Sequence, residues 1–413
     1  MQYGCIAERL GHSFSKEIHA ELGDYLYELC EIAPDALDAF LQKRDFRGIN
    51  VTIPYKERVI PHLFYIDEQA KSIGAVNTVV NRDGKLYGYN TDFYGMKALI
   101  ERLGLDLGGK KVAVLGTGGT SKTARTVAAF LGAGEILCVS RAAREGIIDY
   151  GTLKACHADV EIIINTTPCG MYPNPNATAV DINCFPRLQG VVDAVYNPLR
   201  PQLVLDAQAR GIPAEGGLFM LVAQAVRASE IFLDTTYPAE VLERVYRKIL
   251  SQKENIVLIG MPGCGKSTVG AMLAARMCRT FCDLDAEIEA DTGKTIPEIF
   301  ETLGEQGFRD IESRVLCERV AQRNGLVIAT GGGAILRDEN VNALRRNGRL
   351  YFLDRPLADL IPTGDRPLAS STEAVRRRYE ERYHRYCTAS DVQIEVKSDP
   401  EGVALAVQTA FLA

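Results

Sequence analysis

The chain has no tryptophan, and only five histidines occur among its 413 residues. No two of these histidines have the spacing of metal ligands, so the sequence offers no histidine-based metal site. It also lacks a long apolar run, because no segment approaches the roughly eighteen uninterrupted apolar residues of a membrane span. Met1 to Cys5 lacks the basic-then-apolar pattern of a signal peptide. These absences predict a cytoplasmic protein without a membrane partner.

Eleven cysteines are present, an odd number, and no two form a C-x-x-C pair. This usage favours reduced thiols over a disulfide framework. The net charge of −6 argues against a nucleic-acid partner, which normally requires a basic face. An apolar share of 46% and a charged share of 24% are those of an ordinary globular protein, and 413 residues provide for two or three domains. None of these quantities sets the oligomeric state.

Short apolar strands alternate with helical segments up to about residue 250, a pattern that predicts α/β layers. Two helices follow the strands, over 217–233 and 237–250, with apolar residues at helical spacing. The polar stretch 251–254 is predicted to be a linker, and the strand 255–259 opens the next domain. The strands expected before the linker are 48–52, 111–115, 136–139, 162–165 and 191–193.

A glycine-rich turn, Gly116-x-Gly118-x-x-Ser121, follows the strand 111–115 and precedes a predicted helix. Backbone N–H groups at such a helix start attract phosphate, so the turn is typical of dinucleotide binding. Serine stands where the third glycine is usual, and a tight turn without a ligand is the alternative.

The next strand, 136–139, ends in Ser140 and Arg141, with Arg144 following and no acid at its tip. An acid at this place binds the ribose 2′-hydroxyl of NAD, whereas arginine suits a 2′-phosphate. The sequence therefore predicts NADP(H) as the redox cofactor.

A second glycine loop, Gly260-x-x-x-x-Gly265-Lys266-Ser267, follows the strand 255–259 and forms a complete P-loop. Lys266 is expected to reach the β- and γ-phosphates of ATP, and Ser267 to bind Mg²⁺. Two nucleotide sites of different design predict two activities. The residues expected around ATP in this loop are Gly263, Cys264, Gly265, Lys266, Ser267 and Thr268.

Further motifs surround the first glycine loop, and their order resembles that of shikimate dehydrogenase over roughly residues 3–250. The motifs are Gly11–Ser15, Gly48–Lys56, Ile73–Thr78, Gly88–Asp92, Asn165–Thr167, Asp193-x-x-Tyr196-x-Pro198 and Gly217-x-x-Met220-Leu221-x-x-Gln224. The resemblance implies an α/β substrate-binding domain over 1–92, completed by the helix around 218–250, and an NADP-binding Rossmann domain over 93–250.

The same resemblance places Lys56 and Asp92 at the carbonyl that is reduced. Reducing a ring ketone requires a hydride donor, a proton source and polar groups that fix the ring; a structural salt bridge is the alternative role of the pair. The substrate residues implied are Ser13, Ser15, Asn50, Thr52, Asn77, Tyr196 and Gln224. The cofactor residues implied are Gly116, Thr117, Gly118, Gly119, Thr120, Ser140, Arg141, Arg144, Thr166 and Gly217.

Downstream of the P-loop, the segment Phe281–Glu289 and the glycines of 330–334 are similar to shikimate kinase, and the match covers about 254–410. The resemblance implies a P-loop domain like the nucleoside-monophosphate kinases over 255–413. Substrate would be held by Asp285, Arg309, Gly331, Gly332, Gly333 and Arg382. In the lid Asp365–Leu368, Arg366 would contact phosphate, and Asp283 would bind Mg²⁺ through water.

The chemistry fits an anionic polyol, because arginines pair with its carboxylate and Asp285 can orient the attacking hydroxyl. Two departures from the family pattern concern ATP: the lid segment 357–368 is short, and 397–400 lacks an arginine often present. We therefore expect the ATP affinity to differ from that of relatives.

Taken together, the resemblances imply a bifunctional enzyme of chorismate and aromatic amino-acid biosynthesis. It would reduce 3-dehydroshikimate to shikimate with NADPH and phosphorylate shikimate to shikimate 3-phosphate with ATP. Two alternatives stay open. The redox substrate could be quinate or another cyclohexane acid, and the chain could be a metabolite-sensing regulator like the fungal quinate repressors. Intact Lys56, Asp92, Lys266, Asp285 and Arg309 favour the enzyme.

Overall fold

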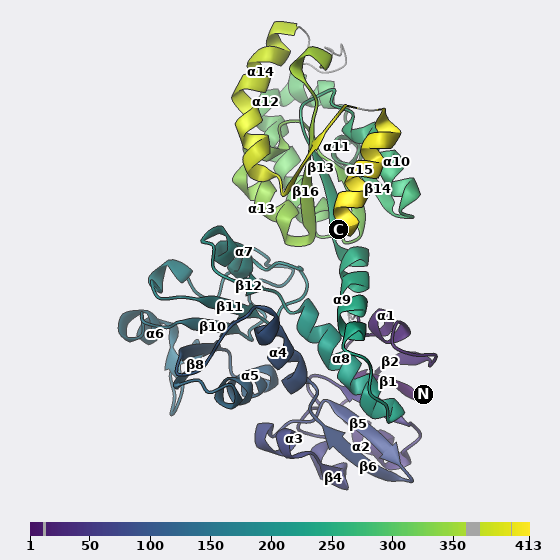
Figure 1. Ribbon diagram of the computed structural model, residues 1–413, viewed down its shortest axis with the longest axis vertical. Helices are drawn as coiled ribbons and strands as arrows, with labels where there is room; N and C mark the ends of the chain where they lie inside the picture. Colours follow the sequence, from purple (N-terminus) through teal and green to yellow (C-terminus); the bar gives the residue numbers. More distant parts are fainter. Residues whose placement is uncertain (11–13, 361–371, 398) are drawn as a thin grey trace. The chain divides into compact units, whose positions relative to one another are not determined.

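The computed structural model describes residues 1–10, 14–360, 372–397 and 399–413 (Figure 1). The chain divides into two compact units, Met1–Ile249 and Leu250–Ala413. Ser13 and Arg366, together with the predicted lid 365–368, lie outside the described residues. Within the described part of the chain, no helix is both long enough and apolar enough to cross a membrane.

The first unit begins with a six-stranded sheet in the order β2-β1-β3-β5-β6-β4. Strands β2, β1 and β3 are parallel, whereas β5 pairs antiparallel with both β3 and β6. The strands are β1 Tyr3–Ala7, β2 Tyr27–Glu31, β3 Gly48–Val51, β4 Tyr65–Ile66, β5 Thr78–Arg82 and β6 Lys85–Tyr89. Helices α1 Ser15–Ala20, α2 Leu37–Lys43 and α3 Glu68–Ile73 accompany them. Leu37, Leu41 and Ile49 belong to the core of this layer.

A second six-stranded sheet, entirely parallel, follows in the order β12-β11-β10-β7-β8-β9. Its strands are β7 Lys111–Leu115, β8 Glu135–Ser140, β9 Ile148–Asp149, β10 Ile162–Asn165, β11 Gly190–Asp193 and β12 Ala214–Glu215, with helices α5 Gly119–Phe130, α6 Tyr150–Cys156 and α7 Gln202–Ala209. The strand order reverses between β7 and β10, where doubly wound sheets bind nucleotides. The predicted Rossmann fold is thus confirmed.

Helices α4 Asp92–Arg102 and α8 Leu218–Leu233 pack against each other within the first unit. A Cβ atom on Gly95 would lie 2.5 Å from the carbonyl oxygen of Met220, so glycine permits this close approach. Asp92 and Gln224, both predicted site residues, lie on this helix pair.

The second unit is built on a five-stranded parallel sheet in the order β14-β15-β13-β16-β17. The strands are β13 Asn255–Ile259, β14 Thr280–Asp283, β15 Leu326–Ala329, β16 Gly348–Asp354 and β17 Val392–Glu395. The helices are α10 Lys266–Arg276, α11 Leu284–Thr292, α12 Ile296–Val315, α13 Asp338–Asn347, α14 Thr372–Ala389 and α15 Pro400–Leu412. Helices α13 and α14 lie on one side of the sheet and α10 and α15 on the other (Figure 1).

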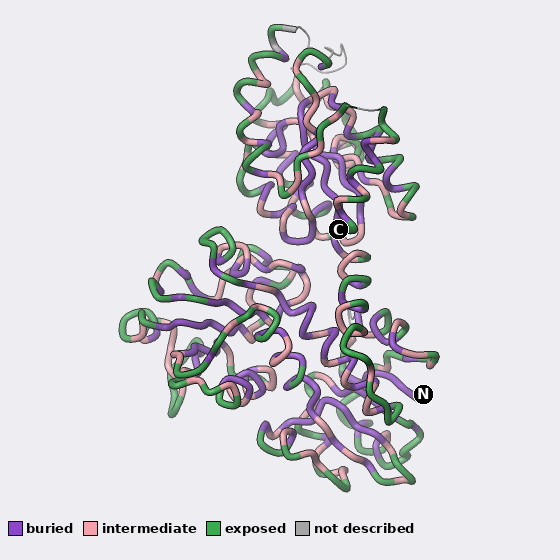
Figure 2. Tube along the Cα trace, viewed as in Figure 1, coloured by how far each residue is buried: buried purple, intermediate pink, exposed green. Residues whose placement is uncertain are grey.

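Five short helical turns complete the described secondary structure: η1 Ile60–His62, η2 Ile182–Cys184, η3 Leu316–Val320, η4 Ala334–Leu336 and η5 Leu357–Asp359. In both units the central strands are buried, whereas edge strands such as β2 and β17 and the outer faces of the helices are exposed in part (Figure 2). Strands β7, β10 and β13 read as near-continuous apolar runs because both faces of a parallel sheet are covered.

The predicted linker at 251–254 is not an extended segment, because helix α9 Glu240–Lys253 includes its first three residues. Arg279 Nη1 donates a hydrogen bond of 2.7 Å to the carbonyl of Glu254, and the Gly325 amide donates one of 3.0 Å to the carbonyl of Lys253. The carbonyls of Lys253 and Glu254, at and just after the end of the helix, thus have partners within their own unit, and Glu254 is only 1% exposed. The boundary between the units falls inside α9, after Ile249.

Candidate active sites

The first unit contains a cavity of about 540 Å³ where the ends of its two sheets meet helices α4 and α8. Most of the residues predicted to bind substrate line this cavity, and Thr120 and Gly217, predicted for the cofactor, line it too. The predicted substrate and catalytic residues in its wall are Ser15, Asn50, Thr52, Lys56, Asn77, Asp92, Tyr196 and Gln224. The fold therefore brings together residues as far apart in the sequence as Ser15 and Gln224.

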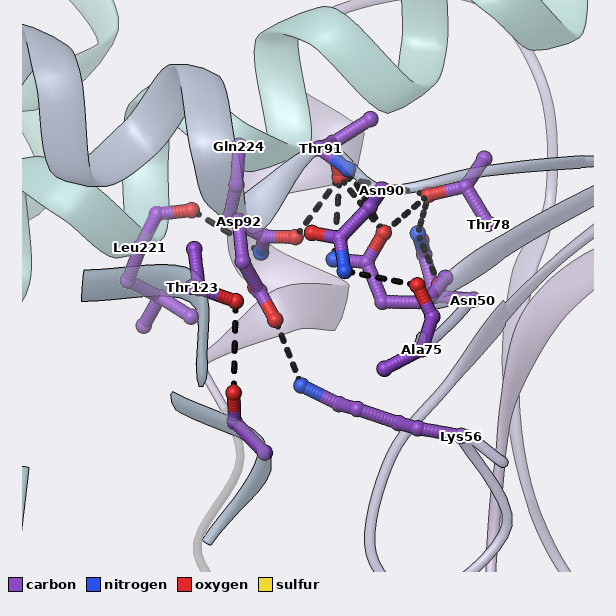
Figure 3. Close-up of polar contacts among 12 residues, drawn as sticks. Asn50, Lys56, Ala75, Thr78, Asn90, Thr91, Asp92, Thr123, Leu221 and Gln224 are labelled. Carbon is purple, nitrogen blue, oxygen red and sulfur yellow. Dashed lines mark hydrogen bonds and ion pairs between the residues drawn. The ribbon is translucent and has the colours of Figure 1, made fainter. Parts of the chain in front are cut away.

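Lys56 and Asp92 form an ion pair at the cavity wall (Figure 3). Lys56 Nζ lies 2.6 Å from Asp92 Oδ2, and the two side chains are 16% and 12% exposed. Lys56 follows β3 and Asp92 is the first residue of α4, so the pair connects two elements. The Cδ atom of Lys56 lies 3.9 Å from the position a Cβ would take on Gly119, the first residue of α5. The lysine thus stands beside the glycine turn as well as in the cavity.

A network of buried amides and hydroxyls lies behind the pair (Figure 3). Asn50 Nδ2 donates to Thr78 Oγ1 at 3.1 Å, and Asn77 Nδ2 donates to Thr91 Oγ1 at 3.1 Å. The Thr91 amide donates to Asn77 Oδ1 at 2.7 Å, and Thr91 Oγ1 donates to Gln224 Oε1 at 3.3 Å. Mutual hydrogen bonds fix the orientations of these neutral groups, which suit the hydroxyls of a polyol.

The glycine turn 116–118 connects β7 to α5 and leaves space for a phosphate group. Gly116 has φ +109°, and a Cβ there would lie 2.7 Å from Thr166 Oγ1. Gly118 has nothing within 4 Å of such an atom. Ser121, at the position of the usual third glycine, donates to the Gly116 carbonyl at 2.7 Å and so closes the turn. These features fit a dinucleotide at the start of α5.

Ser140, Arg141 and Arg144 follow β8, the neighbour of β7. Both arginines are exposed, and neither makes an ion pair with a described residue. Ser140 Oγ donates to the Ala142 carbonyl at 2.7 Å, which holds the start of this loop. The loop can therefore offer two free guanidinium groups to a phosphate.

Asp193, at the end of β11, holds two loops of the second sheet together. Asn165 Nδ2 donates to its two oxygens at 3.0 and 3.1 Å, and the Val195 amide donates at 2.9 Å. Burial raises the pKa of Asp193 to about 7, with these hydrogen bonds acting in the opposite direction. The carboxyl group ties the turn that carries Thr166 to the segment that leads to Tyr196. The motif Asp-x-x-Tyr was visible in the sequence, but this contact with Asn165 was not.

In the second unit, a cavity of about 240 Å³ lies at the P-loop. The residues in its wall are Gly263, Gly265, Lys266, Ser267, Thr268, Asp283, Asp285, Thr330, Gly331 and Gly332. The predicted nucleotide and Mg²⁺ residues therefore share one space with Asp285. Cys264 is buried beneath the loop at 1% exposure and does not line the cavity.

The polar groups of the P-loop bond to protein atoms in this structure. Lys266 Nζ donates to the carbonyls of Gly260 and Met261 at 2.8 and 3.0 Å. Ser267 Oγ donates to Asp283 Oδ2 at 2.6 Å. A serine hydroxyl and a carboxylate are oxygen ligands of the kind that Mg²⁺ accepts, so the pair fits the metal predicted here.

Next to this cavity, Arg309 and Glu312 form a buried ion pair on α12. Arg309 Nη1 lies 2.6 Å from Glu312 Oε2, and the side chains are 10% and 1% exposed. Burial raises the pKa of Glu312, and the adjacent guanidinium lowers it in part. Glu312 lies three residues after Arg309 in the sequence, but the structure was needed to show that the two side chains pair.

The three glycines 331–333 pass through the space between these side chains. A Cβ on Gly331 would lie 2.6 Å from Glu312 Oε1, and one on Gly333 would lie 2.2 Å from Arg309 Nη2. Arg382 Nη1, from α14, donates to the Gly332 carbonyl at 3.3 Å. A side chain at Gly331 or Gly333 would displace the buried ion pair, and the loop contacts both arginines, Arg309 from α12 and Arg382 from α14.

A doubly wound dinucleotide fold with a lysine–aspartate pair, joined to a P-loop sheet, defines an oxidoreductase combined with a phosphotransferase. The sequence model described as the shikimate dehydrogenase substrate binding domain matches residues 5–79, and that described as shikimate kinase matches residues 262–411. The chain is 38% identical over 265 residues to a shikimate dehydrogenase (NADP(+)) of Clostridium perfringens, which covers 60% of this chain and 97% of the relative.

Two solved structures agree with this assignment. Shikimate dehydrogenase 1 from Peptoclostridium difficile is 35% identical with a TM-score of 0.55, covering 60% of this chain and 98% of its own. A chorismate mutase/shikimate 5-dehydrogenase fusion from Clostridium acetobutylicum is 31% identical with a TM-score of 0.57, covering 60% and 96%. The chain belongs to the shikimate dehydrogenase family and carries a shikimate kinase domain in its second unit. It joins NADP-dependent oxidoreductase and kinase activities of aromatic amino-acid biosynthesis.

Proposed function

We propose that Lys56 and Asp92 carry out proton transfer in the reduction of 3-dehydroshikimate to shikimate. The observation that carries the proposal is the position of Lys56, which reaches both the polar cavity and the first turn of α5. NADPH, when bound at that turn, supplies the hydride. Lys56 holds a proton at Nζ and delivers it to the oxygen of the reduced carbonyl. Asp92, 2.6 Å from Nζ, holds the ammonium group in place at the cavity wall.

The neutral side chains of the same wall position the ring. Asn50, Asn77 and Gln224 present amide groups whose orientation is fixed by their hydrogen bonds, and Tyr196 and Thr52 add hydroxyls. Ser15 and Ser13 are proposed to bind the carboxylate. Because these side chains fix the ring beside Lys56, proton delivery takes place within one complex and needs no further encounter between reactants.

For the kinase unit, Asp285 orients the attacking hydroxyl of shikimate, and Arg309 and Arg382 pair with its carboxylate. Mg-ATP supplies the phosphoryl group when bound. Lys266 and the amides of the P-loop stabilise the negative charge on the phosphates, which requires Lys266 to leave its present carbonyl partners. The residues that would hold Mg²⁺ are Ser267, directly, and Asp283, through water.

The two reactions act on one oxygen atom in sequence. The first unit converts a ring carbonyl into a hydroxyl, and the second phosphorylates that hydroxyl. Removal of shikimate by the kinase draws the reduction forward by mass action, which gives the joined chain a chemical rationale.

The deciding experiment offers the full chain 3-dehydroshikimate and NADPH, followed by ATP and Mg²⁺, while NADPH absorbance and ADP are recorded. We expect NADPH oxidation first and ADP formation only after shikimate has formed. Oxidation of quinate with a kcat/KM equal to that of shikimate would favour the broader redox substrate. Binding of both ring acids without any turnover would instead favour the sensor.

A further inference from the structure

Arg9 lies in the wall of the first-unit cavity, although no motif points to it. It follows β1 and lines the cavity together with Leu10 and Ser15. Three charged side chains line this cavity among the described residues: Arg9, Lys56 and Asp92. Because Lys56 and Asp92 neutralise each other at 2.6 Å, the net charge of the described wall is that of the Arg9 guanidinium.

No carboxylate in the described part of the chain pairs with Arg9. The neighbouring carboxylate of Glu31, on β2, accepts a hydrogen bond of 2.7 Å from the Leu10 amide instead. Arg9 is exposed at the cavity wall, so its planar fork of donors can reach an incoming anion. A free guanidinium at the edge of an otherwise neutral polar cavity is suited to bidentate pairing with a carboxylate.

We propose that Arg9 binds the carboxylate of the ring substrate and so selects acids over their neutral analogues. This inference rests on the proposed reduction of 3-dehydroshikimate. The side chains proposed to bind the hydroxyls, Asn50 and Asn77, are neutral and sit deeper in the wall, at 8% and 3% exposure. Ser15, proposed for the carboxylate, lines the cavity six positions after Arg9. The charge and the serine thus come from the same stretch of chain.

The cofactor is the other anion that could use this charge. Arg9 follows a strand of the first sheet, whereas the glycine turn and the two exposed arginines at 141 and 144 belong to the second sheet. The Michaelis constants of the two substrates therefore separate the possibilities.

The test measures oxidation of shikimate and of methyl shikimate with NADP⁺ by the full chain and by Arg9→Gln. We expect the KM for shikimate to rise about tenfold with kcat nearly unchanged, because the pairing is equal in ground and transition states. The KM for the methyl ester and that for NADP⁺ should stay constant. Arg9→Lys should fall between the two proteins, since it keeps the charge and loses the fork.

The matched control is Arg58→Gln. Arg58 is exposed in the same unit, donates to the Pro34 carbonyl at 2.8 Å and does not line the cavity. The Arg58→Gln variant removes one positive charge but leaves the cavity wall unchanged, so the KM for shikimate should not change. An equal rise for acid and ester, an equal effect of Arg58→Gln, or a rise in the KM for NADP⁺ would overturn the assignment. If the unmodified chain oxidises neither compound, the proposed reduction itself fails.

Discussion

The two units build their sites in different ways. The cavity of the first unit draws on segments from Cys5 to Gln224 and needs both of its sheets. The P-loop cavity of the second unit takes its walls from the carboxyl ends of β13, β14 and β15, which are neighbours in one sheet. In the proposed assignment, the redox site joins two sheets, one for each substrate, whereas the kinase site binds both substrates at one sheet edge. Variants in one unit should accordingly leave the other reaction unchanged.

The units also differ in how they hold charge. Lys56 and Asp92 both line the cavity of the first unit, so each faces the space that a ligand would occupy. Neither Arg309 nor Glu312 lines the P-loop cavity, and the Glu312 side chain of this pair is only 1% exposed. A buried pair is destabilised strongly when one partner is removed, because the other charge is left without compensation. Removing a charge of the pair in the first unit should therefore lower activity with little loss of stability. Removing a charge of the pair in the second unit should lower both.

The largest effect is expected for Lys56→Ala. The reductase rate should fall by roughly 10²–10⁴, the usual contribution of a positioned acid or base. Phosphorylation of shikimate by the same preparation should be unchanged, as measured by ADP release. A variant that keeps most of its reductase rate would make the ion pair structural.

Lys266→Ala and Asp285→Asn test the same independence from the other side. Each should lower phosphorylation by about 10²–10³, through lost charge stabilisation and lost orientation of the hydroxyl. NADPH oxidation should continue at the rate of the unmodified chain. A parallel loss of reductase activity would show that the units do not act independently.

Arg309→Ala should change both binding and stability. The KM for shikimate should rise, because the pairing with the carboxylate is similar in ground and transition states. Unfolding of the second unit should become easier by about 3–5 kcal/mol, since Glu312 stays buried without its partner. The double variant Arg309→Met with Glu312→Leu should restore stability in a denaturant titration but not the binding of shikimate. Weaker ATP binding with unchanged shikimate binding would reverse our placement of the two substrates.

Charge reversal at Arg141 should have a smaller and more selective effect. Arg141→Glu should raise the KM for NADPH about tenfold while leaving NADH use unchanged, because only NADPH carries the 2′-phosphate. Steady-state kinetics with both cofactors decide the matter. Equal use of both by the unmodified chain would contradict the cofactor assignment.

Much of this contrast could be read from the sequence. The predicted strands 111–115, 162–165 and 255–259 coincide with β7, β10 and β13. They could be predicted because parallel strands buried on both faces consist of nearly continuous apolar residues. Helix α9 extends three residues into the predicted linker 251–254, because polar residues suit a helix end as well as a linker. Its helical state depends on contacts with Arg279 and Gly325, which lie far along the chain.

The sites show the same limit. The sequence motifs predicted most of the residues that line the two cavities, because glycine turns and their neighbours keep fixed spacings. The roles of Asp193, Glu312 and Arg9 were not accessible, because each depends on what a distant segment places beside it. The burial of a side chain and its partner are properties of the folded chain, so the spacing of residues along the sequence does not predict them. The roles assigned to the motif residues stay predictions until the variants are measured.

The smallest expected effect comes from dividing the chain. Every residue proposed for one reaction lies within one compact unit, so each unit should keep its rate when produced alone. The division has to respect α9, because Ser251–Glu254 belong with the second unit and the earlier turns with the first. Pieces covering 1–253 and 250–413 satisfy both requirements. An equimolar mixture should convert 3-dehydroshikimate to shikimate 3-phosphate with the time course of the intact chain, because shikimate exchanges through solvent. A lag in the mixture, or free shikimate that the intact chain does not release, would demonstrate direct transfer and break the independence of the two units.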